Sequence, residues 1–150
     1  WTYVLAKELD HVVRGKCCQM DYYGNKESVC PWCDAENSVI SVSAYKVVGE
    51  RKEFKWDFVH EISEEVINIP MRVLEGVNSN HLDEKAFRIT CVEDGIEIGD
   101  LSNQYDFFLN NSTGKQIYGS TKFSSMNNIT LSAIDRRNGN EYLLEIEVKQ

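Results

Sequence analysis

The sequence predicts a mainly β protein, with an antiparallel β-sandwich in residues 37–150 preceded by a short helix and a cysteine-rich module in residues 1–36. Short apolar and β-branched segments recur through residues 37–150 with turn residues between them, a pattern typical of sandwiches and, as second choice, of barrels. Upstream of these segments, four of the five cysteines fall within seventeen residues, from Cys17 to Cys33. We therefore expect two parts with different sources of stability.

The first predicted element is a helix over residues 1–16. Trp1, Leu5, Leu9 and Val12 recur at the spacing of one helix face. Gly15 would end this helix, because glycine is common just beyond the last helical turn.

The remaining predicted elements are strands, and the proline and turn residues in and between them indicate how they are arranged. Phe54, Trp56 and Phe58 alternate with polar residues and should share one core-facing side. Pro70 indicates an edge strand or a bulge, and Asn138-Gly139 predicts a type I′ turn with positive φ at both residues, joining two antiparallel strands. The predicted strands are residues 39–43, 44–48, 54–58, 66–73, 87–92, 95–98, 105–109, 116–123, 129–134 and 142–148.

The cysteine cluster predicts a metal site. Cys30 and Cys33 form a C-x2-C knuckle, and Cys17 and Cys18 offer two further thiolates. Four soft ligands in this spacing are typical of structural zinc, which is bound tetrahedrally. Vicinal cysteines rarely both face one ion, so a nearby histidine or carboxylate, His11 or Asp21, is an alternative fourth ligand.

Two other interpretations of the cysteines remain open. Cys30 and Cys33 could cycle through a disulfide as a thiol-redox pair, although the thioredoxin-like βαβ setting that this chemistry needs is not predicted. The thiols could also be buried small side chains or disulfide partners in a secreted recognition fragment. An odd, clustered set of cysteines favours a reduced, cytoplasmic protein with zinc.

Residues 1–36 resemble the segment that follows the kinase domain in certain multidomain bacterial serine/threonine protein kinases. The resemblance rests on Trp1 with the leucines that follow it, on Cys17, and on Cys30-Pro31-Trp32-Cys33. In that group, a Trp-bearing last helix leads into a zinc-ribbon-like element with an intervening histidine. Here no histidine lies between Cys18 and Cys30, so the resemblance implies Cys18 as its substitute, with Cys17, Cys30 and Cys33 as the other ligands.

Residues 37–150 are compared with two families of β-sandwich. Residues 96–100 are faintly similar to a strand end of forkhead-associated domains, but Asp100 stands where those domains have arginine. An immunoglobulin-like sandwich is the better match, and the predicted fold is therefore immunoglobulin-like or forkhead-associated-like.

Charge limits the classes of partner. Residues 1–35 carry four Lys/Arg and five Asp/Glu, and the net charge of −8 leaves −7 on residues 36–150. No basic stripe is present, which disfavours nucleic acid and anionic membrane surfaces. The expected partner is another protein, and no small-molecule ligand is indicated.

The sequence predicts no catalytic function. The glycine-rich loop and catalytic-loop motifs of kinases are missing, as are the serine-hydrolase elbow and the zinc-protease helix motif. His60 beside Glu61, His81 near Asp83, and the acidic residues between 93 and 100 are weak candidates for acid–base chemistry or calcium. We therefore predict a non-catalytic protein-interaction or regulatory region of a bacterial signalling kinase, with a structural zinc site.

Overall fold

The computed structural model describes residues 1–24, 29–62, 66–77, 84–124 and 128–149, and most of them lie in antiparallel strands. Within these ranges, two helices and eleven strands follow one another: α1 (Thr2–Leu9), β1 (Val12–Arg14), β2 (Asp21–Tyr23), β3 (Val39–Val48), β4 (Arg51–Glu61), β5 (Val66–Pro70), α2 (Arg72–Glu75), β6 (Lys85–Val92), β7 (Gly95–Gly99), β8 (Tyr105–Leu109), β9 (Thr121–Phe123), β10 (Ile129–Asp135) and β11 (Glu141–Lys149). The prediction of a mainly β protein is confirmed.

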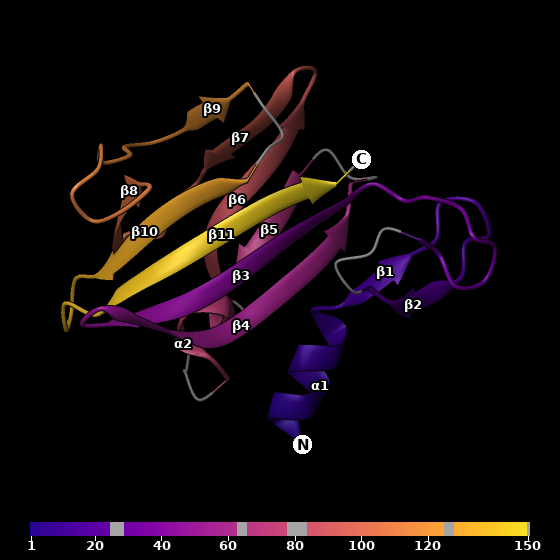
Figure 1. The fold of residues 1–150 in the computed structure, drawn as a ribbon, viewed down its shortest axis with the longest axis horizontal. Helices are drawn as coiled ribbons and strands as arrows, with labels where there is room; N and C mark the ends of the chain where they lie inside the picture. Colours follow the sequence, from indigo (N-terminus) through magenta and orange to yellow (C-terminus); the bar gives the residue numbers. More distant parts are fainter. Residues whose placement is uncertain (25–28, 63–65, 78–83, 125–127, 150) are drawn as a thin grey trace.

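The strands form two main sheets and one small ribbon. The larger sheet has the order β4-β3-β11-β10-β8, the smaller sheet has the order β5-β6-β7-β9, and β1 pairs with β2. Every pairing is antiparallel. Figure 1 shows the larger sheet in front of the smaller one, with the ribbon beside β3 and β4.

One hydrophobic core lies between the two main sheets. Alternate residues of each strand point into it, as the period of two in a β-strand requires. From the larger sheet come side chains such as Trp56, Phe107 and Leu144, and from the smaller sheet Phe87 and Ile98, all nearly or fully buried.

A bulge in β4 corrects the prediction that Phe54 shares a face with Trp56 and Phe58. Trp56 pairs with Ala44, but Phe54 pairs with the next residue of β3, Tyr45, so the register shifts between them. An extra residue at a bulge inverts the alternation that follows it. Phe54 is therefore 52 % exposed and packs edge-on against Tyr45, with ring centroids 5.9 Å apart.

The predicted helix over residues 1–16 is wrong in its second half. The helix ends at Leu9, and Val12 and Val13 enter β1, where they pair with Tyr23 and Tyr22. Helical spacing and a short β-branched run coexist in this segment. Pairing with β2 decides between them, because a helix this short gains little stability by itself.

The turn at Asn138-Gly139 differs in type from the prediction. The expected antiparallel pairing of β10 with β11 is confirmed. Gly139 has φ +74, whereas Asn138 is not in the positive-φ region. The loop between β10 and β11 is longer than a two-residue turn, and the Gly139 N–H donates to the Asp135 carbonyl at 2.8 Å. This loop needs one left-handed residue, whereas a type I′ turn needs two.

Two further strand predictions are shortened. The segment beginning at Val66 leaves the sheet at Pro70, where the register shifts, and continues as α2, so the predicted bulge at this edge strand is confirmed. In the segment from Gln116 to Phe123, only β9 is a strand, while Gln116 makes an isolated bridge to Phe108.

The N-terminal segment is anchored to β4. The buried Asp10 carboxylate accepts hydrogen bonds from Trp56 Nε1 at 2.7 Å and from Arg72 Nε at 2.8 Å. The Asp10 carbonyl also accepts a hydrogen bond from the Val59 N–H at 2.8 Å. His11 Nε2 lies 3.1 Å from Asp57 Oδ2, and the His11 ring stacks on Tyr23.

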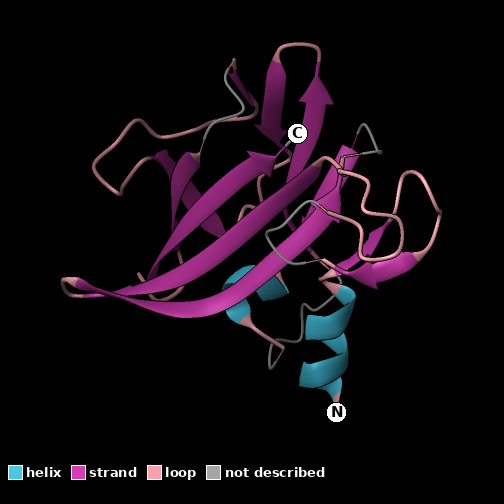
Figure 2. Ribbon diagram, turned by 45° about the vertical axis from the view of Figure 1, so that its right-hand side comes forward, coloured by secondary structure: helices cyan, strands magenta, loops and turns pink. Residues whose placement is uncertain are grey.

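Within the part of the chain that the structure describes, neither helix is long and apolar enough to cross a membrane. Figure 2 shows the two helices of the described residues, α1 and the short α2.

Candidate metal centre

The first turn of the site, residues 15–20, closes the β1–β2 ribbon. Arg14 pairs with Asp21 at its base. The Gly15 N–H donates to the Met20 carbonyl at 2.9 Å, and the Gln19 N–H donates to the Gly15 carbonyl at 2.8 Å. Gln19 has φ +59. Cys18 lies just before that left-handed residue, and its sulfur is held on the inside of the turn.

The second turn, residues 30–35, contains the C-x2-C knuckle. Val29 and Glu36 form an antiparallel bridge at its base. The Cys30 N–H donates to the Ala35 carbonyl at 2.9 Å, and the Asp34 N–H donates to the Cys30 carbonyl at 2.9 Å. Cys33 precedes Asp34, whose φ is +54. The cysteines at the first and fourth positions of this turn therefore face the same side.

The two turns bring three thiols together. The Sγ atoms of Cys18, Cys30 and Cys33 all lie within 4.8 Å of one another, and those of Cys18 and Cys30 are 3.5 Å apart. Sulfurs bound tetrahedrally to one zinc ion at 2.3 Å are separated by about 3.8 Å, so the group is close to the dimensions that zinc requires. Cys30 is buried, Cys18 is half-buried and Cys33 is exposed. All five cysteines are free thiols.

Backbone amides favour the thiolate at Cys30. Burial acts to raise the pKa of Cys30, but hydrogen bonds from the Trp32 N–H and from the thiols of Cys18 and Cys33 outweigh it, and its pKa lies below the ordinary value. At Cys18, the Met20 N–H acts to lower the pKa, but burial and the neighbouring sulfurs raise it overall. Cys30 thus ionises more readily than Cys18, and the thiolate is the form that binds a metal.

Gly15 leaves room for the sulfurs. A Cβ atom at this position would lie 2.9 Å from Cys18 Sγ and 3.1 Å from Cys30 Sγ. Such contacts are closer than carbon and sulfur tolerate, so a side chain at position 15 would require the sulfurs to shift. The donor set and this space fit a soft divalent ion, zinc above all.

The structure separates the other predicted ligands from this group. Cys17 is exposed and is not one of the three converging thiols. Both nitrogens of His11 are engaged elsewhere, Nδ1 with the Lys7 carbonyl at 2.7 Å and Nε2 with Asp57. Asp21 is exposed on β2, and its carbonyl accepts a hydrogen bond from Trp32 Nε1.

The residue that the sequence analysis missed is Gly15, which it assigned to the end of a helix. A usable signal was present, because Gly15-x2-Cys18 has the same spacing as Cys30-x2-Cys33. Reading the first segment as a second knuckle would have placed Cys18, rather than Cys17, in the site.

Among the described residues, the histidines and acidic side chains suggested for acid–base chemistry or calcium do not form a catalytic or calcium-binding arrangement. His60 Nδ1 bonds with the Glu61 backbone carbonyl at 2.8 Å. In the acidic segment, Asp100 forms ion pairs with Lys85 and Arg88, and Glu97 lies 3.8 Å from Lys122. These carboxylates neutralise cations and do not form a calcium cage. His81 and Asp83 lie outside the described residues.

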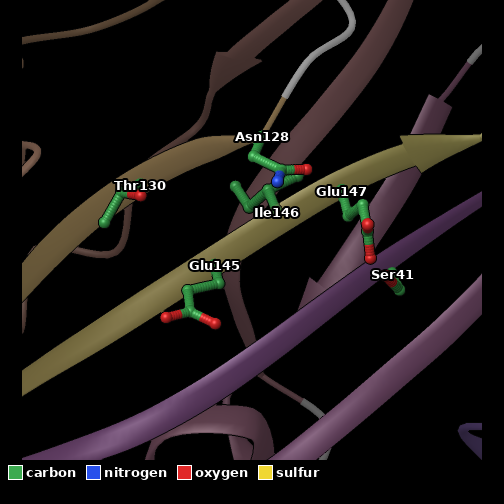
Figure 3. Close-up of a pocket in the computed structure, with 6 residues that line it drawn as sticks. All are labelled: Ser41, Asn128, Thr130, Glu145, Ile146 and Glu147. Atoms are coloured by element: carbon green, nitrogen blue, oxygen red, sulfur yellow. The ribbon is translucent and has the colours of Figure 1, made fainter. Parts of the chain in front are cut away.

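A shallow depression of about 350 Å³ lies on the larger sheet, over β3, β10 and β11. Glu147 extends toward Ser41 on the neighbouring strand, while Glu145 lies further along β11, where it pairs with Thr130 of β10 (Figure 3). Glu145 is already paired with Lys52 at 2.6 Å. The depression is open and acidic, and the described residues that line it include no histidine or cysteine.

No family model, no characterised protein and no solved structure matches this chain.

Proposed function

We propose that Cys18, Cys30 and Cys33 hold a structural zinc ion that fixes the β1–β2 ribbon to the larger sheet. The observation that carries the proposal is the convergence of three thiols on the space beside Gly15. Cys30 also packs with Val39 and Val59 of the sheet. Ion binding would therefore stabilise both the turns and their contact with β3 and β4, because the free energy of binding a structural ion adds to that of folding.

At the level of the whole chain, we propose a non-catalytic protein-interaction or regulatory region that follows the kinase domain of a bacterial signalling kinase in the cytoplasm. Its support is the zinc-ribbon-like spacing of the cysteines and the surface of α1. That helix contributes no buried residue, and its Leu5 and Leu9 are exposed, as is Trp1 just before it. A helix that packs against a further domain would present such apolar side chains. The immunoglobulin-like or forkhead-associated-like sandwich is part of this proposal.

The test of the metal site is elemental analysis of the whole chain, purified under reducing conditions. We expect one zinc per chain, lost in Cys30→Ser and retained in Cys17→Ser. The second variant is a matched control because Cys17 lies beside the group without belonging to it. A reduced, well-folded and metal-free wild type would contradict the proposal. A wild type that is two mass units lighter than the fully reduced chain would instead favour a disulfide or thiol-redox function.

The interaction role is tested with the same chain. We expect capture of a defined protein partner from bacterial cytosol, weakened by Leu5→Glu together with Leu9→Glu. A gel-shift assay with mixed DNA and RNA runs in parallel. Tight, salt-sensitive nucleic-acid binding without a protein partner would overturn the role, since salt sensitivity is the signature of phosphate contacts.

A further inference from the structure

The first and second turns are copies of one backbone motif. In each turn, the first residue donates its N–H to the carbonyl of the sixth, and the fifth donates its N–H to the carbonyl of the first. The fifth residue is left-handed in both, with φ +59 at Gln19 and φ +54 at Asp34. The flanking residues pair antiparallel in both as well. Position by position, Gly15 corresponds to Cys30 and Cys18 corresponds to Cys33.

This correspondence assigns a role to each position of the motif. Positions one and four carry the two sulfurs of the second turn, Cys30 and Cys33. In the first turn, position four carries Cys18 and position one carries Gly15. A Cβ on Gly15 would point at the sulfurs of Cys18 and Cys30, at 2.9 and 3.1 Å. Position one of the first turn is thus directed into the cluster but supplies no donor atom.

The same correspondence explains why Cys17 does not take that place. Cys17 is the third residue of its turn and corresponds to Trp32. Both side chains are exposed, Trp32 to 62 %. The third position of the motif points away from the cluster in each copy, and a cysteine there faces solvent.

We propose that the metal bound here has three ligands from this segment and an exchangeable fourth position beside Gly15, which accepts a soft or borderline donor such as an imidazole or a thiol. The inference rests on the proposed metal site. Three thiolates bring a divalent ion to a net charge of −1, so a neutral donor adds no further charge repulsion. Sites with three protein ligands characteristically keep such an open position. The exposure of Cys33 leaves the group accessible from solution.

The test is a cobalt-substituted whole chain, titrated with imidazole and followed through its visible absorption bands. We expect the bands to shift on imidazole addition. In the metal-loaded chain, the bound ion should protect Cys18, Cys30 and Cys33 from an alkylating reagent and leave Cys17 reactive. Protection of Cys17, or bands that do not respond to imidazole, would overturn the proposal. Failure to bind cobalt at all would instead contradict the metal site itself.

Position 15 provides the matched variants. Gly15→Cys supplies the missing sulfur, so we expect an added thiolate-to-cobalt band, at least tenfold tighter binding and loss of the imidazole response. Gly15→Ala adds only the carbon and should weaken binding, because its Cβ meets the sulfurs. Equal gains from both variants would overturn the assignment of the fourth position.

Two further variants test whether another residue of this chain fills the fourth position. They give an answer even if Gly15→Cys does not fold. Cys17→Ser and Glu27→Ala, the latter outside the described residues, should both keep the wild-type bands and the imidazole response. A changed spectrum in either variant would identify an internal fourth ligand and refute the exchangeable position.

Discussion

The carboxylate of Asp10 accepts a 2.7 Å hydrogen bond from the indole of Trp56 and thereby joins the N-terminal segment to the main core. Asp10 is 2 % exposed, and Arg72 balances its charge from α2. A buried carboxylate of this kind is held only where donors satisfy it, since an uncompensated charge in the interior is costly. The N-terminal segment is therefore fixed to the β-sheets by a polar contact as well as by packing.

We predict that Asp10→Ala lowers the free energy of unfolding by about 2–4 kcal/mol, because it leaves the Trp56 indole and the Arg72 guanidinium without their shared acceptor. Urea unfolding followed by tryptophan fluorescence measures this change. Asp94→Asn, an exposed acid in the β6–β7 turn, is the control and should change the midpoint little. A similar small change for Asp10→Ala would show that the anchor is not important.

The His11–Asp57 pair should make stability depend on pH. Burial acts to lower the pKa of His11, but its hydrogen bonds with Asp57 and with the Lys7 carbonyl, and the charge of Asp10, raise it overall above 6.5. The hydrogen bond with His11 lowers the pKa of Asp57 below 3.8, against the effect of burial. The pair's contribution is therefore complete between these two ordinary values. It is lost as pH rises through the folded pKa of His11, and also as pH falls through that of Asp57.

The measurement compares wild type with Asp57→Asn by urea unfolding from pH 5 to 9. We expect the wild type to exceed the variant most near pH 5.5 and the difference to shrink as the pH rises. A difference that grows with pH would mean that His11 is neutral in the folded protein at pH 5.5.

Removing the proposed zinc ion should loosen the β1–β2 ribbon while the two main sheets persist. Chelation is expected to lower the Tm and change the fluorescence of Trp32, whose indole bonds to the Asp21 carbonyl in β2. Far-UV circular dichroism should retain its β signal, because the core between the sheets contains none of the three thiols. Complete unfolding by a chelator would instead make the ion essential to the whole fold.

Gly139 should tolerate asparagine but not valine. Its φ is +74, and a Cβ would meet nothing within 4 Å, so the cost of substitution is conformational rather than steric. A β-branched residue held in the left-handed region costs about 1–2 kcal/mol, while asparagine adopts it with less strain. Equal urea midpoints for Gly139→Val and Gly139→Asn would contradict this explanation.

The sequence predicted the strands better than their faces. Apolar alternation located β10 and β11 and their antiparallel pairing, because strong local patterns and a turn signal agree there. The bulge opposite Tyr45 had no comparable signal, since it arises from pairing with β3 and inverted the face of Phe54. Pairing with β2 likewise places Val12 and Val13 in a strand, whereas their helical spacing alone predicted that they continue the N-terminal helix.

The sequence located the cysteine cluster but not which of its four cysteines converge. Clustered cysteines indicate a metal in any fold, so Cys18, Cys30 and Cys33 were all expected there. The distinction between Cys17 and its neighbour depends on which side chain the turn directs inward. That choice follows from the left-handed residue at Gln19, which residue types alone do not reveal.

The hydrogen bond from the Val59 N–H to the Asp10 carbonyl has a consequence for association between chains. β4 is the outermost strand of its sheet, and its free edge offers backbone groups to any extended segment. Occupying part of that edge from within the same molecule deprives a second chain of a pairing template. Proteolytic loss of the residues before β3 would expose this edge and promote strand-to-strand aggregation.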